Sequence, residues 1–110
     1  MTRAPRSKAA TPARSIEWSA RALRDLQEID DFIAADNPVA AEKWVGKLIS
    51  AAEAAATAPL AGRAVPETER ADIREVFVRT YRILYRVLTD RIVILTVFEG
   101  SMRFPSVDDG

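Results

Sequence analysis

The sequence predicts an α+β domain of order β-α-α-β-β-β, in which a helical hairpin packs on one face of a small antiparallel sheet. Two segments with helical periodicity follow one another between residues 19 and 58. Three runs rich in β-branched and aromatic residues come next, at about 73–78, 81–88 and 91–98. Apart from a short strand at 15–18, helices and strands are thus segregated along the chain, as they are in α+β domains.

Length and composition bound the function before any motif does. A chain of 110 residues, 48% of them hydrophobic, is long enough to form one domain with a substantial core. Cysteine and histidine are absent, which excludes disulfides, thiolate nucleophiles, Ser-His-Asp triads and imidazole metal sites. No apolar run reaches the roughly 18 residues of a membrane span, and no phosphate-binding loop is present. We therefore expect no cofactor, no metal and no membrane association.

The first elements are a strand and an amphipathic helix. Residues 15–18 alternate polar and apolar side chains, as a short strand does. Ser19 is a candidate N-cap, because its hydroxyl can accept a hydrogen bond from the first helical turn. Apolar residues then recur at i, i+3, i+4 spacing, namely Ala22, Leu23, Leu26, Ile29, Phe32 and Ile33.

The second helix starts where Asp36-Asn37-Pro38 ends the first. Asn37 can cap it, and Pro38 suits its first position, where no amide donor is needed. Its predicted buried stripe consists of Ala41, Trp44, Val45, Leu48, Ala52 and Ala55. The alanine-rich end at 51–56 lets the two helices approach closely, and the helix should end before Pro59. Residues 59–72 are rich in turn formers and predict a connector.

The runs at 81–88 and 91–98, separated by Thr89-Asp90, predict a β-hairpin. Because strand side chains alternate, the first run has one apolar and aromatic face, which consists of Tyr81, Ile83, Tyr85 and Val87. Both tyrosines are either core residues or platforms on which bases stack. The other face mixes arginines and leucines, namely Arg82, Leu84, Arg86 and Leu88. We interpret this mixed face as an open surface that meets a partner; the alternative is charge that only prevents edge aggregation.

Charge is segregated along a chain whose net charge is zero. Residues 1–14 carry four cations and no acid, and residues 17–57 carry four cations and eight acids. Residues 73–103 carry six cations, all of them arginine, and three acids. Arginine binds planar anions bidentately, which favours a recognition surface there. A body close to neutrality nevertheless argues against strong binding to nucleic acid.

We expect one domain over residues 15–105, preceded by a disordered basic tail over 1–14 and followed by a flexible end over 106–110. The tail consists mainly of Ala, Pro, Arg, Ser and Thr and can bury little apolar surface. It lacks the apolar region of a secretory signal. Its acid-free composition fits an organellar transit peptide, an extended start site or a plain tail, and we favour the last two.

Short motifs in a fixed order carry a family resemblance. They are Trp18-Ser19-x-x-Ala22-x-x-Asp25-Leu26-x-x-Ile29, Asp36-Asn37-Pro38-x-Ala40-Ala41, Gly62-Arg63-x-Val65-Pro66-Glu67, Ile73-Arg74-Glu75, Tyr81-Arg82-Ile83-x-Tyr85-Arg86-Val87 and Ile94-Leu95-x-Val97-x-Glu99-Gly100-x-x-Arg103-x-Pro105. In this order and spacing, about residues 15–105 resemble the RelE/ParE superfamily of toxins from bacterial type II toxin–antitoxin modules. The fold of that family is the one expected above.

The resemblance implies a growth-inhibiting toxin of the plasmid-stabilisation type that works in the bacterial cytoplasm. Such toxins are neutralised by a cognate antitoxin whose flexible C-terminal segment folds along the toxin surface. ParE-like members are described as inhibitors of DNA gyrase without nuclease activity. RelE-like members enter the ribosomal A site and cut mRNA. Neither branch implies a small-molecule substrate.

The residues that the resemblance carries over favour the ParE-like branch. Histidine-free RelE-like enzymes use two arginines, two strand lysines and a C-terminal tyrosine. Arg82 matches the first arginine, and Arg103 approximates the second with an offset of one residue. Glu75 stands where one lysine would lie, and no tyrosine follows Arg103. Because the general acid and base are missing, we expect no enzymatic activity. An mRNA endonuclease that uses Arg82 and Arg103 is the alternative.

Two sets of residues are candidates for contacts with other molecules. The candidate toxin face consists of Arg63, Arg82, Arg86, Glu99 and Arg103, in which Glu99 either forms a turn or orients Arg82 or Arg103. The candidate antitoxin site combines a groove along the first helix with the open sheet face, and its anchors are Leu23, Leu26, Phe32, Leu84 and Leu88. On this interpretation, Leu84→Asp weakens antitoxin binding far more than Arg91→Ala does.

Overall fold

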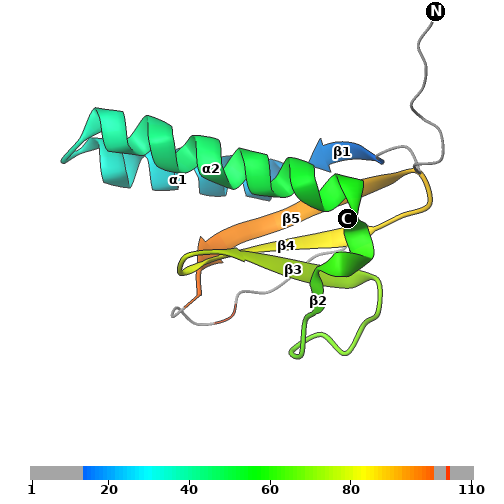
Figure 1. Cartoon of the computed structure of the whole chain (residues 1–110). Helices are drawn as coiled ribbons and strands as arrows, with labels where there is room; N and C mark the ends of the chain where they lie inside the picture. The colour runs from blue at the N-terminus through cyan, green and yellow to red at the C-terminus, as the bar shows by residue number, and fades with distance from the viewer. Residues whose placement is uncertain (1–13, 101–103, 105–110) are drawn as a thin grey trace, which may run out of the picture.

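A computed structural model describes residues 14–100 and residue 104 of the chain. Figure 1 shows two long helices lying side by side on one face of a twisted sheet. The elements are β1 (Ser15–Trp18), α1 (Ala20–Ala34), α2 (Pro38–Thr57), a 3₁₀ turn η1 (Pro59–Ala61), β2 (Arg63–Ala64), β3 (Ile73–Val78), β4 (Tyr81–Val87) and β5 (Arg91–Glu99). The predicted helical hairpin on a sheet is confirmed. The tail predicted over 1–14, except Arg14, and the end predicted over 106–110 lie outside the described residues.

Both helices begin where local signals place them. The Ser19 hydroxyl accepts a hydrogen bond from the Ala22 amide at 3.0 Å, and Asn37 Oδ1 accepts one from the Ala40 amide at 3.1 Å. Pro38 occupies the first turn of α2, and α2 ends at Thr57, before Pro59. Neither helix of the described chain combines the length and the apolarity that crossing a membrane requires.

The sheet has five strands in the order β1-β5-β4-β3-β2 and is mixed. β3, β4 and β5 form the predicted antiparallel meander, but β1 pairs with β5 in parallel, from Ser15↔Arg91 to Trp18↔Ile94. The first strand of the chain can pair with the last strand in a parallel or an antiparallel orientation. The sequence does not specify which of the two forms. The connector also supplies an unpredicted strand, β2, which covers the first half of the β3 edge.

β5 contains an extra residue at its centre. Leu84 of β4 pairs with Thr96 and Tyr85 pairs with Ile94, so Leu95 has no partner across the ladder. The start of α1 holds this bulge. The Ser19 hydroxyl donates to the Leu95 carbonyl at 3.0 Å. The Asp25 carboxylate accepts from the Thr96 hydroxyl at 2.7 Å and from the Val97 amide at 2.9 Å.

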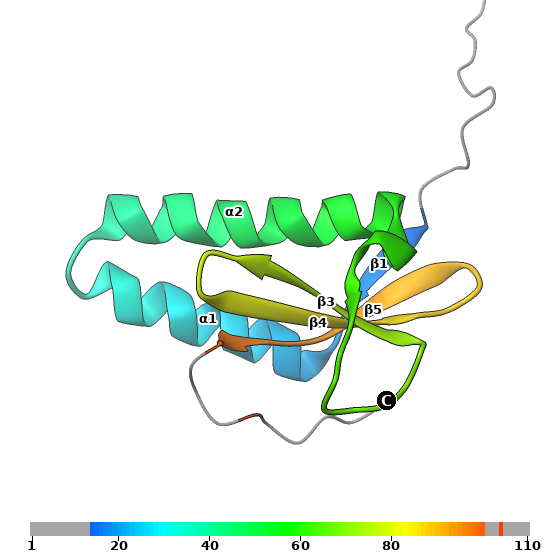
Figure 2. The same cartoon turned by 60° about the horizontal axis from the view of Figure 1, so that its bottom comes forward.

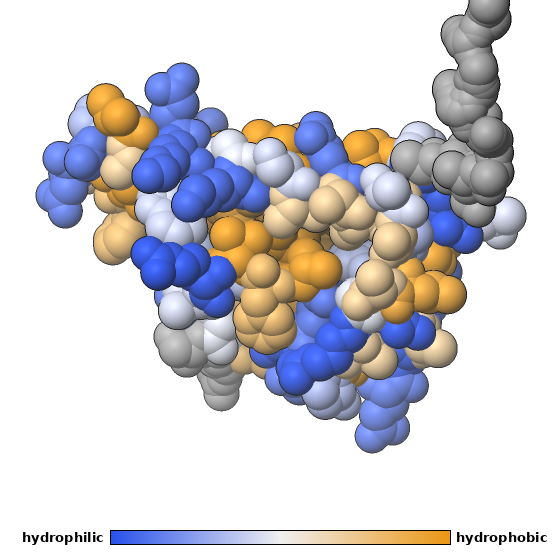
Figure 3. Space-filling view, in the orientation of Figure 1, coloured by the Kyte–Doolittle hydropathy of each residue, from blue (hydrophilic) through white to orange (hydrophobic). Residues whose placement is uncertain are grey.

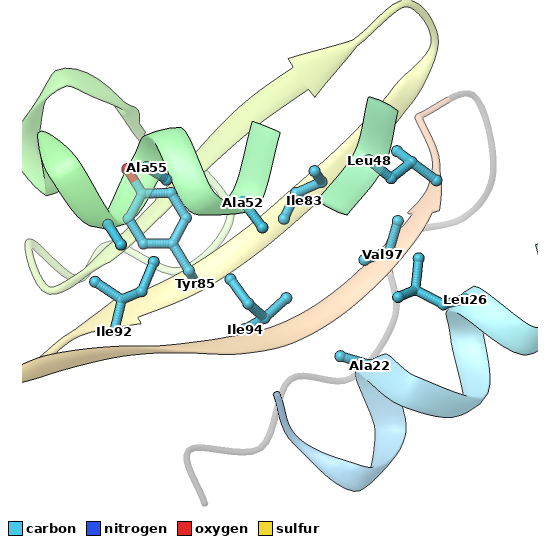
Figure 4. Packing of buried hydrophobic residues seen from close by; sticks show 11 residues of the cluster. Ala22, Leu26, Leu48, Ala52, Ala55, Ile83, Tyr85, Ile92, Ile94 and Val97 are labelled. Carbon is cyan, nitrogen blue, oxygen red and sulfur yellow. The ribbon is translucent and has the colours of Figure 1, made fainter. Parts of the chain in front are cut away.

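The main core lies between the helices and the sheet. Figure 4 shows Ala22 and Leu26 of α1 and Leu48, Ala52 and Ala55 of α2 facing side chains of β4 and β5. The strand residues of this cluster are Ile83, Tyr85, Ile92, Ile94 and Val97. Tyr85 is fully buried and its hydroxyl donates to the Pro59 carbonyl at 2.6 Å, so this tyrosine is a core residue and not a stacking platform.

A second, smaller core covers the opposite face of the sheet. It consists of Val65, Ile73, Leu84 and Leu95, with Val93, Phe98 and Phe104 packed at its border. Figure 2 shows the connector before β3 looping out on the side of the sheet away from the helices. The prediction of an open face at Leu84 is therefore wrong: Leu84 is fully buried. The connector carries Val65 onto this face, and alternation along β4 alone could not reveal that cover.

Position 62 requires a glycine because the Tyr85 hydroxyl packs closely against it. A Cβ atom at this position would lie 2.2 Å from Tyr85 Oη and 3.0 Å from the Glu75 carbonyl oxygen. The absence of a side chain thus lets β2 approach the hydrogen bond between Tyr85 and Pro59.

We predict that Gly62→Ala lowers the free energy of unfolding by about 2 kcal/mol, the cost of overpacking a filled core. Tyr85→Phe alone should cost about 1 kcal/mol, because the Pro59 carbonyl loses its donor. The double variant should be more stable than the sum of the two losses implies, because the clashing hydroxyl is gone. Urea unfolding of the four proteins measures this. Strictly additive losses would mean that the backbone moves away from Tyr85 instead.

Candidate functional site

The strand arginine Arg82 lies inside a cluster of carboxylates. Its Nε donates to Glu75 Oε1 at 2.8 Å, and its two terminal nitrogens lie 3.1 and 3.3 Å from the carboxylate oxygens of Glu67. Only 7% of the residue is exposed. Every guanidinium nitrogen therefore already contacts a carboxylate, and little of the side chain faces solvent.

Glu75 joins this cluster to a second arginine. Its side chain is fully buried, and its Oε2 accepts from Arg63 Nε at 2.7 Å. Two arginines, Arg63 and Arg82, thus face two carboxylates, Glu67 and Glu75, and the formal charges of the four cancel. A buried carboxylate with donors on both oxygens is well satisfied, whereas the same group without them would be costly.

Three aromatic rings enclose the guanidinium of Arg82. Its central carbon lies 5.3 Å from the ring centres of Phe98 and Phe104 and 5.7 Å from that of Phe77. Phe98 and Phe104 meet edge to face, with centres 5.9 Å apart. Aromatic faces attract a cation, so the rings and the carboxylates hold Arg82 in the same place.

The pKa values of the cluster agree with this geometry. The hydrogen bond from Arg82 is the main reason that the pKa of Glu67 lies below its ordinary value. Burial disfavours the charged form of Arg82, but the hydrogen bonds to Glu67 and Glu75 outweigh it and raise the pKa of Arg82. Arg82 is thus a permanent cation, and it has no capacity to act as a general base.

The other predicted toxin-face residues do not gather around Arg82. Arg86 pairs with Asp72 at 3.2 Å, farther along the sheet, and Arg63 joins the cluster from the edge strand. Glu99 accepts a hydrogen bond from the Thr80 hydroxyl in the β3–β4 turn. Of the two predicted roles of Glu99, this contact agrees with the one in a turn. Arg103 lies outside the described residues. The predicted face is therefore a neutral, partly buried cluster around Arg82 and a separate ion pair at Arg86.

The predicted antitoxin anchors do not form one surface either. Leu26 is 8% exposed and belongs to the main core, and Leu84 is buried on the far face. Leu23 and Phe32 are 54% and 80% exposed. They are nine residues apart on α1, which places them on opposite sides of the helix, so no single groove holds both. Leu88 is half-buried in the β4–β5 turn, where its carbonyl accepts from Arg14.

One groove does run along α1 on the side of Phe32. It has a volume of about 540 Å³ and lies between α1 and the end of β5. Its lining residues are Arg21, Asp25, Glu28, Ile29, Phe32, Tyr81, Thr96, Val97, Phe98 and Glu99. The predicted residues Phe32 and Glu99 thus contribute to it. Within the described residues, no group of three carboxylates could hold a metal ion.

A shallower depression of about 290 Å³ follows the end of α2. It is lined by small side chains and Val76, namely Ala51, Ala54, Ala55, Ala58, Ala61, Gly62 and Val76. Figure 3 shows apolar side chains gathered below α2, with charged side chains around them. The depression has no charged residue in its lining, so it offers no chemistry beyond apolar contact.

The partners of Arg82 were not predicted from the sequence. Glu67 belongs to the connector motif, but nothing local indicates that its carboxylate reaches a strand 15 residues later. Phe104 lies beyond the last strand, where the sequence shows only a chain end. Glu75 carried a usable signal: a carboxylate two residues after Ile73 falls on the same strand face as Ile73, which is buried.

The comparisons with known proteins agree with the fold. The family model of the ParE toxin of type II toxin–antitoxin systems, parDE, matches residues 16–104. The curated protein "Putative toxin Y4kP" from Sinorhizobium fredii is 34% identical over 96 residues, which cover 86% of this chain and 96% of that protein.

Two solved structures share the architecture. The chromosomal ParDE system of P. aeruginosa aligns with a TM-score of 0.66 and 22% identity, over 79% of this chain and 96% of that one. The RelBE2 toxin–antitoxin complex of Mycobacterium tuberculosis aligns with a TM-score of 0.60 and 23% identity, over 80% and 99%. At these identities the likeness concerns the fold.

We predict that Arg82→Met and Glu75→Leu each lower the free energy of unfolding by about 3 kcal/mol, because each removes a buried partner and leaves Glu75 with Arg63 alone or Arg82 with Glu67 alone. The double variant should lose less than the sum, since both charges leave together. Arg91→Met, which breaks an exposed pair with Glu17, is the control and should cost less than about 1 kcal/mol. Guanidinium unfolding measures all four. Additive losses would contradict a coupled pair.

We also predict that acid destabilises the connector. Because the pKa values of Glu67 and Asp72 are lowered in the folded state, chiefly by hydrogen bonds from Arg82 and Arg70, these carboxylates stabilise the fold above their unfolded pKa values. That contribution is lost as the pH falls through the lower folded values. Glu67→Gln should therefore flatten the decline in stability below about pH 4.5.

Unfolding free energies measured from pH 7 to pH 3 provide the test. The control is Glu42→Gln, an exposed carboxylate of α2 that makes no ion pair with any described residue. Identical pH profiles for Glu67→Gln and the wild type would show that the hydrogen bond to Arg82 is not formed in solution.

Proposed function

The chain belongs to the ParE toxin family of type II toxin–antitoxin systems, and on that basis we propose that it stops growth by binding DNA gyrase and is neutralised by a cognate antitoxin. Contact between proteins, without chemistry on RNA, is the proposed mode of action. The antitoxin proposal is supported by the fold, which is shared with the ParDE system and with a RelBE2 toxin–antitoxin complex.

The observation that carries the proposal is the enclosure of Arg82 by two carboxylates and by aromatic rings. An arginine stabilises a phosphorane only if its N–H groups can point at the phosphate oxygens. The N–H groups of Arg82 point instead at Glu67 and Glu75, and Phe104 lies over the guanidinium. An incoming phosphate would have to displace two carboxylates and would meet their negative charge.

The electrostatics around this face point in the same direction. Glu75 occupies the strand position at which RelE-like enzymes carry a lysine, and it is fully buried against Arg82 and Arg63. The cluster is neutral as a whole, so it offers no attraction to the phosphates of mRNA. A nuclease also needs a group that exchanges a proton near neutral pH, and arginine cannot do so.

We predict that the purified chain inhibits supercoiling of relaxed plasmid by gyrase at near-stoichiometric amounts. In a translating extract the same preparation should leave mRNA intact. Agarose gels of plasmid topoisomers and primer extension on the mRNA provide the two measurements. Induced expression in a gyrase-dependent bacterium should stop growth and trap cleaved chromosomal DNA.

The control is the same chain together with its cognate antitoxin, mixed in for the supercoiling assay and co-expressed for the growth assay, which should restore both supercoiling and growth. Ribosome-dependent cuts in the mRNA, with gyrase unaffected, would refute the proposal and favour the RelE-like alternative. Growth without any effect on gyrase or mRNA would identify a chain that has lost toxicity.

A further inference from the structure

β3 is only half covered at its outer edge. β2 pairs with Arg74 and Glu75, and no strand of the described chain lies beside residues 76–78 on that edge. α2 packs against this part of the sheet, and the small side chains of its second half form, together with Val76, the depression of about 290 Å³. The side of the molecule between α2 and the end of β3 is therefore open and apolar (Figure 3).

We call this side the α2–β3 surface and define it by six residues, namely Trp44, Lys47, Ala54, Ala58, Val76 and Arg79. The four residues from α2 are spaced by three, seven and four positions, which places them on one face of the helix. Both alanines are exposed, and Val76 is half-buried beside them. The centre of the surface thus offers apolar contact without a bulky side chain of its own.

Two cations lie at the other end of the surface, on the ring of the half-buried Trp44. Lys47 Nζ is 4.9 Å from the ring centre, and the central guanidinium carbon of Arg79 is 5.4 Å from it. Within the described chain neither cation forms an ion pair, in contrast to Arg82.

The carboxylates near this surface do not compensate these two charges. The exposed acids of α2, Glu42 and Glu53, lie on the side of the helix that is turned away from Lys47. Glu99 reaches the β3–β4 turn but is bonded to the Thr80 hydroxyl. The α2–β3 surface therefore combines an apolar centre with positive charge that has no counter-charge.

Arg79 also occupies a strained backbone position. Its φ is 56°, in the two-residue turn between β3 and β4. Glycine adopts this left-handed conformation at lower cost than arginine does. The arginine places an exposed cation over Trp44, which glycine would not do. A strained position occupied by an exposed, charged side chain is typical of binding sites.

We propose that the α2–β3 surface is the side of the chain that contacts gyrase, and that it receives an apolar side chain of gyrase bordered by carboxylates. The apolar side chain fills the depression at Ala54 and Ala58, and the carboxylates face Lys47 and Arg79. This inference rests on the proposed function, because that function supplies the partner.

Charge and shape distinguish this occupant from others. A second copy of the chain would bring four cations together without a counter-charge, since a two-fold contact uses the same surface twice. A DNA duplex would meet Lys47 and Arg79, but the alanine-lined depression offers no donor to a phosphate, and duplex binding draws on many phosphate contacts. An acidic protein surface with an apolar side chain complements both parts of the α2–β3 surface at once.

The test measures the inhibition of gyrase supercoiling by full-length variants. Ala54→Trp fills the depression and Lys47→Glu reverses one charge, so each should raise the half-inhibitory concentration about tenfold or more. Glu53→Trp and Arg24→Glu are the matched controls, because they place the same side chains at exposed positions away from the surface. The controls should change the half-inhibitory concentration less than about threefold.

Arg79→Gly separates binding from folding. Because glycine relieves the strain of the turn, the midpoint of thermal unfolding should not fall, while the half-inhibitory concentration should rise about fivefold or more. In the complex with gyrase, hydrogen exchange over residues 76–79 should slow. A lower unfolding midpoint with unchanged inhibition would show that Arg79 serves the fold alone and would overturn its role in the contact.

The outcomes separate this inference from the proposed function. Unchanged inhibition by Ala54→Trp, Lys47→Glu and Arg79→Gly, with the wild type active on gyrase, would overturn the inference and leave the proposed function intact. If Ala54→Trp instead raised the Kd of the cognate antitoxin, the surface would belong to the antitoxin. Binding of the free chain to a short DNA duplex that Lys47→Glu abolished would assign the surface to DNA, and both results would overturn the inference. A wild type without effect on gyrase would refute the proposed function, and the inference would fall with it.

Discussion

The bulge in β5 determines which residues of this strand face the helices and which face the opposite side of the sheet. Because Leu95 has no partner on β4, Ile92 and Ile94 face the helices before it and Val97 faces them after it. The same shift places Phe98 opposite Arg82, on the other face. Ser19 and Asp25 hold the bulge through its backbone, so the start of α1 is tied to the middle of the sheet. If β5 paired with β4 without the bulge, Val97 would leave the core and Phe98 would leave the arginine together, because successive strand residues face opposite sides.

Local signals predicted the elements well because each acts within a few residues. Ser19, Asn37 and Pro38 fix helix ends through hydrogen bonds or missing donors inside one turn. The parallel pairing of β1, the strand β2 and the bulge involve residues far apart in the sequence, and no local pattern encodes them. The candidate site was predicted less well for the same reason. Arg82 was identified, but its partners Glu67 and Phe104 reach it from the connector and from beyond β5.

The mixed face of β4 shows how an arginine can mislead. Arg82 and Leu84 alternate with core residues, and a strand with cations on one face normally leaves that face in water. Here the connector supplies both an apolar residue, Val65, above Leu84 and a carboxylate beside Arg82. Arginine suits such a position, because its planar head satisfies two carboxylates while its weak hydration makes burial affordable. A charged residue in a strand thus indicates an exposed surface only when no distant segment can neutralise it.

The neutral cluster around Arg82 also limits how this lineage can change. A descendant that exposed Arg82 to a new ligand would first have to lose Glu75 or Glu67, and each loss alone leaves the buried Arg82 with one carboxylate in place of two. Evolution from this state toward phosphate chemistry therefore passes through a less stable intermediate unless two codons change together. Neighbouring branches of one superfamily can be separated in this way by a fitness valley of two substitutions, even though their backbones remain alike.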